Sequence, residues 1–482
     1  MIRYFIACTC FVANVLFYTI RLNLSIAITV MVRHNTSLTV GKMELPLNTT
    51  KSNDNNVQTF DWDEKTQQMI LGAFFYGYAI MPIPGSWLAE HIGGKRMIGF
   101  SIICSSILSI LIPWAAGVSV GLVVILRGLD GMVQGNVIPA TVILLQNWAP
   151  KAELNTIISI AFAGMQMGIT VGSLLSTRLC SMNVLGGWPL SFYTYGSVGL
   201  ILALFWTVFV YDTANEHPCI SQNELALLDS NPSPMESDIK IKSVPWLSIF
   251  TSPPVLAIVI SYFSFDFGVY FFFTDIPTFL SSVLGYDFQT VGVLVLLMCI
   301  SQLVPAVLYG KFMDFLIQRE YLSALNTRKL YAVLSLGIPA VCLLALGYAS
   351  SNEYFMQFLI ITTFGIYGVG NSVLSNPIDL SPMYSGIITG VVMTISSSAG
   401  FIGPFIVGLL TQDNNVLRQW SIMFKITAGI QIFGMIIYLF FAQVEEQEWS
   451  CTGAVMHNGQ KQERSNLKIS NDEEKASLIN KR

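Results

Sequence analysis

The sequence predicts an all-α membrane protein with twelve transmembrane helices in two six-helix pseudo-repeats. The chain of 482 residues is 53% hydrophobic and only 11% charged, whereas soluble proteins carry about a quarter charged residues. Apolar stretches of about 20 residues, the length that crosses a bilayer, occur twelve times, and a polar segment in the middle of the chain divides them six and six. The small net charge of −4 argues against a nucleic-acid partner.

The apolar stretches define the expected organisation of the chain. Residues 1–211 form an N-terminal half, 212–246 a cytoplasmic central loop, 247–443 a C-terminal half, and 444–482 a polar tail expected to be disordered. The first stretch runs well past the length of a signal-peptide core, so it is expected to be retained as a span. The expected spans are 4–32, 67–89, 97–117, 120–147, 155–180, 190–211, 253–279, 289–316, 330–350, 355–376, 385–411 and 420–443.

Lysine and arginine set the expected orientation. With the N-terminus inside, 16 basic residues fall in inner segments, 6 in outer segments and 3 within spans. Cytoplasmic loops carry such an excess of positive charge, so both termini are expected in the cytoplasm. The protein itself is expected in the plasma membrane or in an endosomal or lysosomal membrane.

The two halves repeat one inner-loop pattern. After the second span comes a segment from Gly85 through Glu90, Gly93 and Lys95 to Arg96, and after the eighth comes a shorter match that ends at Asp314. A glycine, an acid and then basic residues at corresponding places indicate an internal repeat. We interpret these residues as an inner gate, in which charge pairs across the halves hold one end closed. Positive-inside topology would explain the basic residues but not the acids.

The segment from Gly85 to Arg96 resembles the cytoplasmic loop motif of the major facilitator superfamily, which implies the major facilitator fold. More narrowly, the chain resembles the anion transporter family of sialin, the vesicular glutamate transporters and the type I sodium–phosphate cotransporters. The resemblance rests on Arg21-Leu-Asn-Leu-Ser-Ile-Ala-Ile, on Gly72-Ala-Phe-Phe-Tyr-Gly-Tyr and on Trp148-Ala-Pro. It implies that Arg21 and Arg127 are functional and that Asn376 belongs to the substrate site.

The chain also departs from that family. The cytoplasmic arm that the family carries before span one is missing. In the span-ten signature, Pro377 and Met383 replace a histidine and an arginine, and Gln134 replaces the glutamate that sialin and the glutamate transporters carry in span four.

Arg21 and Arg127 lie within spans, where an arginine costs about 2.5–3.5 kcal/mol on insertion scales. Two guanidiniums that face a water-filled path suit a carboxylate or a phosphate, because each offers two parallel donors. For Arg127 the alternative is a structural ion pair with Asp130. Arg127, Asp130 and Gln134 share a helical arc of about 60°, which makes Gln134 a further substrate contact. Asp130 is either a proton site or a permanently ionised partner.

Asp266 and Tyr270 stand one turn apart in span seven. A buried carboxylate there would bind a coupling cation or form a gate pair, with Tyr270 in the substrate site; the alternative for Asp266 is a satisfied polar residue in helix packing. The four histidines all lie outside the spans, which argues against an intramembrane metal or nucleophile cluster. No cofactor, metal or enzyme activity is expected.

Two short motifs concern processing and sorting. Asn35 and Asn48 lie in glycosylation sequons of the first outer loop, and Asn48, further from the membrane, is the preferred acceptor. In the tail, Glu474, Leu478 and Ile479 match an acidic dileucine signal that sorting adaptors would read. Chance similarity is the alternative.

Together these features predict a secondary active carrier of small organic or inorganic anions such as phosphate, urate, sialic acid or other carboxylates. Transport would follow alternating access, as a symport coupled to Na⁺ or H⁺ or driven by voltage, and the carrier is expected to be a monomer. One alternative is a sialin-like, proton-coupled exporter of acidic sugars or amino acids from lysosomes or vesicles. An anion channel is the alternative from another class.

Overall fold

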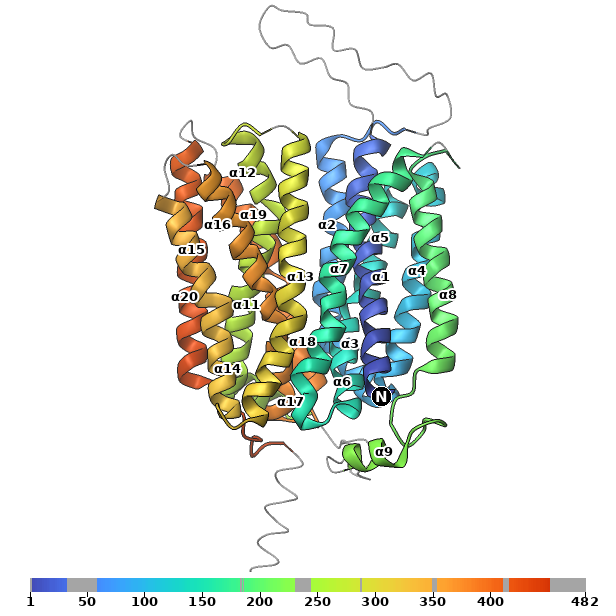
Figure 1. Cartoon of the computed structure of the whole chain (residues 1–482). Helices are drawn as coiled ribbons and strands as arrows, with labels where there is room; N and C mark the ends of the chain where they lie inside the picture. The colour runs from blue at the N-terminus through green and yellow to red at the C-terminus, as the bar shows by residue number, and fades with distance from the viewer. Residues whose placement is uncertain are drawn as a thin grey trace, which may run out of the picture.

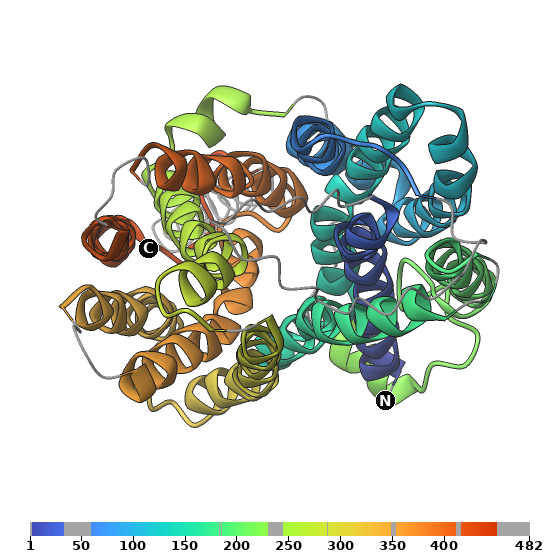
Figure 2. The same cartoon turned by 90° about the horizontal axis from the view of Figure 1, so that it is seen from above.

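The computed structural model consists of two helical bundles that stand side by side when seen along the spans (Figures 1 and 2). It describes residues 2–32, 59–182, 184, 186–229, 244–286, 288–348, 353–410 and 416–450. The first bundle contains α1 (Ile2–Met31), α2 (Glu64–Ile80), α3 (Pro82–Ile92), α4 (Gly94–Val118), α5 (Val120–Gly135), α6 (Val137–Trp148), α7 (Leu154–Ser181) and α8 (Pro189–Phe209).

The second bundle follows a short helix of the central segment, α9 (Gln222–Asp229), and a second short helix, α10 (Trp246–Thr251). It contains α11 (Pro253–Thr274), α12 (Ile276–Ser282), α13 (Phe288–Gln318), α14 (Ala324–Ala332), η2 (Val333–Gly337), α15 (Ile338–Tyr348), α16 (Glu353–Ile366), η3 (Tyr367–Ser375), α17 (Asn376–Leu380), α18 (Ser385–Ser396), α19 (Ala399–Leu410) and α20 (Val416–Phe441).

Ten helical segments of the described chain are long and apolar enough to cross a membrane, and the bent pair α2–α3 makes an eleventh. The remaining expected span, 355–376, corresponds to α16 followed by the 3-10 segment η3. The all-α architecture with two matched groups of spans is therefore confirmed.

Several spans are broken at residues that disrupt helical hydrogen bonding. The second span bends by 51° between Ile80 and Pro82, because proline lacks an amide hydrogen and its ring displaces the preceding turn. The ninth span contains the π-helical turn η2 just before Pro339, and the eleventh is interrupted at Ser397 and Ser398, between α18 and α19.

The chain begins and α20 ends at the same end of the molecule, the lower end in Figure 1. This lower end corresponds to the side that the basic residues predict to be cytoplasmic. The α9 helix lies below the first bundle there (Figure 1). Glu224 on α9 accepts hydrogen bonds of 3.2 Å from the backbone amides of Ile2 and Arg3. Burial raises the pKa of Glu224, but the hydrogen bonds that it accepts outweigh burial and lower the pKa below its usual value.

Two expectations for polar segments need refinement. The central loop contains the docked helix α9, which its polar composition did not indicate. The start of the tail is also ordered, since the Gln447 amide donates to the Leu380 carbonyl over 2.9 Å and Ser450 is fully buried.

Candidate functional site

The first bundle brings α2 and α5 into close contact through glycines. A Cβ added at Gly131 would lie 2.0 Å from the Phe74 carbonyl oxygen, and one at Gly135 would lie 2.9 Å from that of Tyr78. Small residues let two spans approach in this way, and Gly131 and Gly135 form the strip along which α5 packs on α2. The close contact turns the polar edge of α5 toward α1 and α4.

Arg127 lies deep on this edge, with 2% of its surface exposed. Its Nη1 donates to Asp130 Oδ2 over 3.4 Å, and its Nη2 donates to the Arg21 carbonyl over 3.2 Å. The guanidinium carbon also lies 5.0 Å from the centre of the Phe74 ring. The buried Nε has no hydrogen-bond partner among the residues that the structure describes.

Asp130 is well supplied with donors. Its Oδ1 accepts from Ser105 Oγ over 2.5 Å and from Gln134 Nε2 over 3.0 Å, while Oδ2 faces Arg127. Gln134 also donates to the Ser105 hydroxyl over 3.0 Å. A carboxylate that faces three donors suits the interpretation of Asp130 as a permanently ionised partner of Arg127. Gln134 therefore contacts this network directly.

Arg21 is surrounded by aromatic rings. Its guanidinium carbon lies 5.4 Å from the ring centre of Tyr18, 4.8 Å from Phe74, 5.0 Å from Phe75 and 4.7 Å from Tyr78. All four distances are within the range of cation–π attraction. Arg21 remains half-buried, in contrast to Arg127. Because rings cover its faces, the N–H edge of the guanidinium is the part left to bind an anion.

The second bundle contributes Tyr270 and Asp266 from α11. The Tyr270 ring packs edge-on against Phe75 with centroids 6.4 Å apart, and its hydroxyl interacts electrostatically with the nearby Arg21 guanidinium. Asp266 is half-buried and close to Ser396. We call Arg21, Tyr18, Phe74, Phe75, Tyr78 and Tyr270 the Arg21 cluster, since both bundles meet there.

At the lower end, acids from each bundle cap helices of the other. Glu90 Oε1 accepts from the amide of Ile387 over 3.1 Å, in the first turn of α18. Asp314 accepts from the amides of Asn155 (3.3 Å) and Thr156 (2.7 Å) at the start of α7, and from the Asn155 side chain (2.8 Å). Backbone amides at a helix start are suited to a carboxylate.

This geometry differs from the charge pairs that the sequence suggested. The acids do cross between the bundles, but their partners are helix N-termini. Lys95 instead places its amide 2.7 Å from Asp212 Oδ1 and its ammonium 4.5 Å from the Tyr211 ring centre, and Arg96 is exposed. A helix start in the other half carries no sequence signal of its own, which is why the partner could not be foreseen.

The structure requires glycine at Gly85 and Gly93 of the repeated segment. A Cβ at Gly85 would lie 2.4 Å from the Asn136 Cβ, so α3 and the α5–α6 break could not approach. Gly93 adopts φ 101°, which a side chain would strain. This turn directs α4 so that its first amides face Asp212.

One further network at the lower end was not foreseen. Arg328 bonds Asp379 in its own bundle over 2.9 Å and the Asn155 side chain of the other bundle over 2.5 Å. Asn376 belongs to this region: its Nδ2 donates to the Tyr438 hydroxyl over 2.6 Å. The structure thus places Asn376 near the Arg328 network rather than in the Arg21 cluster. Asn35, Asn48, Glu474, Leu478 and Ile479 lie outside the described residues.

The sequence pattern of the Major Facilitator Superfamily matches residues 10–404. The chain belongs to this superfamily. Human sialin is 35% identical over 93% of this chain and 90% of its own length, and bovine vesicular glutamate transporter 1 is 30% identical over 93% and 78%. These relatives place the chain within the anion transporter family that the sequence resembled.

Solved structures of the superfamily share the fold. The Escherichia coli fucose:proton symporter aligns over 92% of this chain and 99% of its own, with a TM-score of 0.64 and 13% identity. The proton:xylose symporter XylE aligns over 91% and 95%, with a TM-score of 0.66 and 12% identity. At these identities the comparison concerns the fold alone. The chain is a multi-pass secondary transporter and not an enzyme.

Proposed function

We propose that this transporter carries small organic anions, with Arg21 as the group that binds the anionic end of the substrate. The observation behind the proposal is that Arg21 stands where the two bundles meet, with Tyr270 of the second bundle beside it. A substrate at that point contacts both halves, so its binding can change how they pack. Alternating access requires such a contact.

The aromatic walls favour an organic anion over inorganic phosphate. The ring faces of Tyr18, Phe74, Phe75 and Tyr78 offer apolar surface next to a single charged edge. A carboxylate can take two parallel hydrogen bonds from a guanidinium, while a carbon skeleton packs on the rings. Phosphate would be desolvated beside the rings without a matching contact. Sialic acid and other carboxylates therefore fit better than phosphate, and so does urate, whose planar ring can pack on the aromatic faces.

Arg127 supports Arg21 in this proposal. It is buried, paired with Asp130, and donates to the Arg21 carbonyl. Its role is to fix the α1 backbone at Arg21 and to add positive potential, and its Nε, which has no partner among the described residues, is a donor that a substrate can use.

Asp266 is the acid we propose for ion coupling. Asp130 is already held by Ser105, Gln134 and Arg127, whereas Asp266 is half-buried with Ser396 in reach. Release of a proton or Na⁺ from Asp266 would change the electrostatic balance beside the Arg21 cluster. Sodium coupling or voltage drive is preferred over sialin-like proton coupling, because Gln134 cannot titrate.

Uptake into proteoliposomes tests the proposal. Labelled urate, sialic acid, glutamate, an aromatic carboxylate and phosphate are supplied in turn, with sodium, pH and voltage varied separately. An organic anion should show saturable uptake and counterflow, and phosphate the weakest uptake of the panel. Flux without saturation or counterflow would instead indicate a channel, and preferred phosphate uptake would contradict the role of the rings.

Arg21→Ala should lower uptake at least about tenfold, because a charged hydrogen bond to the substrate contributes about 1.5–3 kcal/mol. Arg21→Lys should restore little, since the planar fork is lost. Arg178→Ala, at an exposed position of α7, is the matched control and should transport normally. Normal uptake by Arg21→Ala at equal membrane abundance would refute the assignment.

Arg127 needs a paired design. Arg127→Ala alone leaves the Asp130 carboxylate buried and unpaired, which costs about 3–5 kcal/mol and should lower abundance. The double variant Arg127→Leu with Asp130→Leu removes both charges, so it should fold nearly normally and still transport poorly. Normal transport by the double variant would limit the pair to a structural role.

Asp266→Asn should abolish the dependence of uptake on the coupling ion while leaving exchange of substrate. The reverse change, Gln134→Glu, should make uptake newly or more steeply dependent on pH, because it adds a titratable group to the Asp130 network. Wild-type uptake that an inward proton gradient drives strongly and that Asp130→Asn uncouples would instead favour the sialin-like mechanism.

A further inference from the structure

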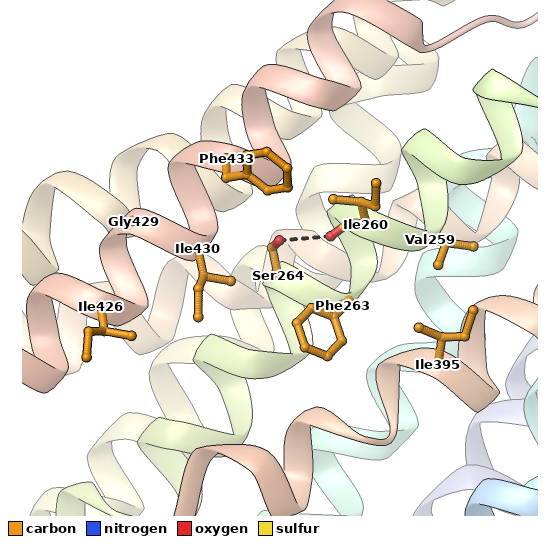
Figure 3. A pocket seen from close by; sticks show the side chains of 9 residues that line it. All are labelled: Val259, Ile260, Phe263, Ser264, Ile395, Ile426, Gly429, Ile430 and Phe433. Carbon is orange, nitrogen blue, oxygen red and sulfur yellow. Dashed lines mark hydrogen bonds between the residues drawn. The ribbon is translucent and has the colours of Figure 1, made fainter. Parts of the chain in front are cut away.

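An apolar groove of about 620 Å³ lies on the second bundle (Figure 3), and none of its wall residues belongs to the Arg21 cluster. Its walls come from three spans. Ile260, Phe263 and Ser264 lie on α11, Ile395 lies near the end of α18, and Gly429 and Phe433 lie on α20. Phe433 and Ile395 are 56% and 39% exposed, so the groove is open to the surroundings of the bundle.

Two glycines shape the α20 wall of the groove. A Cβ at Gly434 would lie 2.3 Å from Ser264 Oγ, so α20 and α11 are in close contact there. At Gly429, an exposed wall residue, an added Cβ meets nothing within 4 Å. The absence of a side chain at Gly429 thus leaves space in the groove.

The chemistry of the walls selects an apolar occupant. Ser264 is the only polar side chain among the wall residues, and its hydroxyl donates to the Ile260 carbonyl over 2.8 Å. The hydrogen of this wall hydroxyl is therefore already donated, which leaves one hydroxyl oxygen as a side-chain acceptor in the groove, and a polar occupant with its other groups unpaired there is costly. A peptide or a sugar is therefore disfavoured.

The depth of the groove identifies where its occupant comes from. The wall residues of α11 lie six to eleven positions after Pro253, where that helix begins at the lower end. At 1.5 Å per residue this is about 9–17 Å into a hydrocarbon core about 30 Å thick. The groove consequently extends from the lower leaflet to about the middle of the core, where hydrocarbon chains are the solvent.

We propose that the groove binds one acyl chain of a phospholipid from the lower leaflet. An acyl chain has apolar surroundings both in the groove and among other lipid chains, so burial from water gives it no preference for the groove. The preference must come from closer packing against the groove walls than against other lipid chains. The wall residue Ile395 directly precedes Ser396, which is in reach of Asp266, and the break at Ser397. The bound chain thus rests against the broken eleventh span and braces it from the lipid side.

Photolabelling of the full chain in nanodiscs tests this site. Phosphatidylcholine with a diazirine in the middle of one acyl chain is incorporated, illuminated, and the adducts are mapped by mass spectrometry. Adducts on the groove segments of α11 and α20 should exceed those on the lipid-facing helix α8 about fivefold, the ratio that several extra dispersion contacts supply. Equal labelling of α8 and the groove would overturn the proposal.

Variants distinguish an acyl-chain binding site from a surface that is only exposed to lipid. Gly429→Phe fills the groove and should remove the fivefold excess, and Gly429→Leu serves if the larger residue prevents expression. Gly292→Phe on α13 is the matched control, since Gly292 is also exposed with nothing within 4 Å of an added Cβ. Adducts unchanged by both Gly429 variants would overturn the proposal. A diazirine sterol that labels the groove where the phospholipid does not would overturn the acyl chain as its occupant.

Discussion

Replacing Asp314 by Asn should open the lower end of this transporter. The carboxylate accepts three hydrogen bonds from Asn155 and Thr156 across the bundle interface. Asn keeps one acceptor oxygen and loses the charge. Hydrogen bonds to a charged group contribute about twice as much as neutral ones. The loss is therefore about 2 kcal/mol, which changes the ratio of closed to open lower ends about 30-fold.

Spin-label distances measure this change. In a cysteine-free background, labels at His91 and Arg319, which are exposed on the first and second bundle, report the separation of the halves at the lower end. Wild type should give mainly the shorter separation, and Asp314→Asn should add a longer one. Asp212→Asn is the control, because Asp212 caps α4 within a single bundle. It should leave the distances unchanged.

Two results would refute the reasoning. If Asp314→Asn and wild type give the same distances at equal abundance, the cap does not hold the lower end closed. If Asp212→Asn lengthens the distances as much as Asp314→Asn does, the effect comes from general destabilisation rather than from a bond between the bundles.

Three further predictions concern other parts of the chain. Gly131→Ala should lower thermal stability strongly because its Cβ would meet a carbonyl of α2, whereas Gly128→Ala, whose nearest contact is 3.7 Å away, should be tolerated in the same thermal-shift assay. Asn48→Gln should remove a glycan-sized mass shift on gels, and an unchanged mass would contradict Asn48 as the glycosylated residue of the first outer loop. Alanine at both Leu478 and Ile479 should increase surface labelling of cells, and an unchanged distribution would leave the tail motif a coincidence.

The spans and their pairing could be predicted because bilayer thickness and helical periodicity act locally. Arg127, Asp130 and Gln134 were predicted to share one face of a helix, and the structure holds them in one network. These neighbours lie within two turns of one helix, where 100° per residue fixes the geometry.

Contacts between distant segments could not be predicted in the same way. The rings around Arg21 come from α1 and α2, and Tyr270 joins them from α11, but phenylalanine and tyrosine are abundant throughout the chain. Asn155 looked like an ordinary helix start, yet its side chain accepts a hydrogen bond from Arg328 and donates one to Asp314. Helix α9 was not predicted, because its sequence is polar. It docks through the Glu224 carboxylate, which accepts hydrogen bonds from two backbone amides, and backbone amides leave no pattern in a sequence.

The Glu90 cap has a consequence for how such a transporter tolerates mutation. The donor opposite this carboxylate is the main-chain amide of Ile387, which every residue except proline supplies. Substitution at position 387 therefore leaves the contact intact, while loss of the acid removes it outright. Among related sequences the contact should appear as an invariant acid with no co-varying position opposite, and methods that infer proximity from paired substitutions would overlook it.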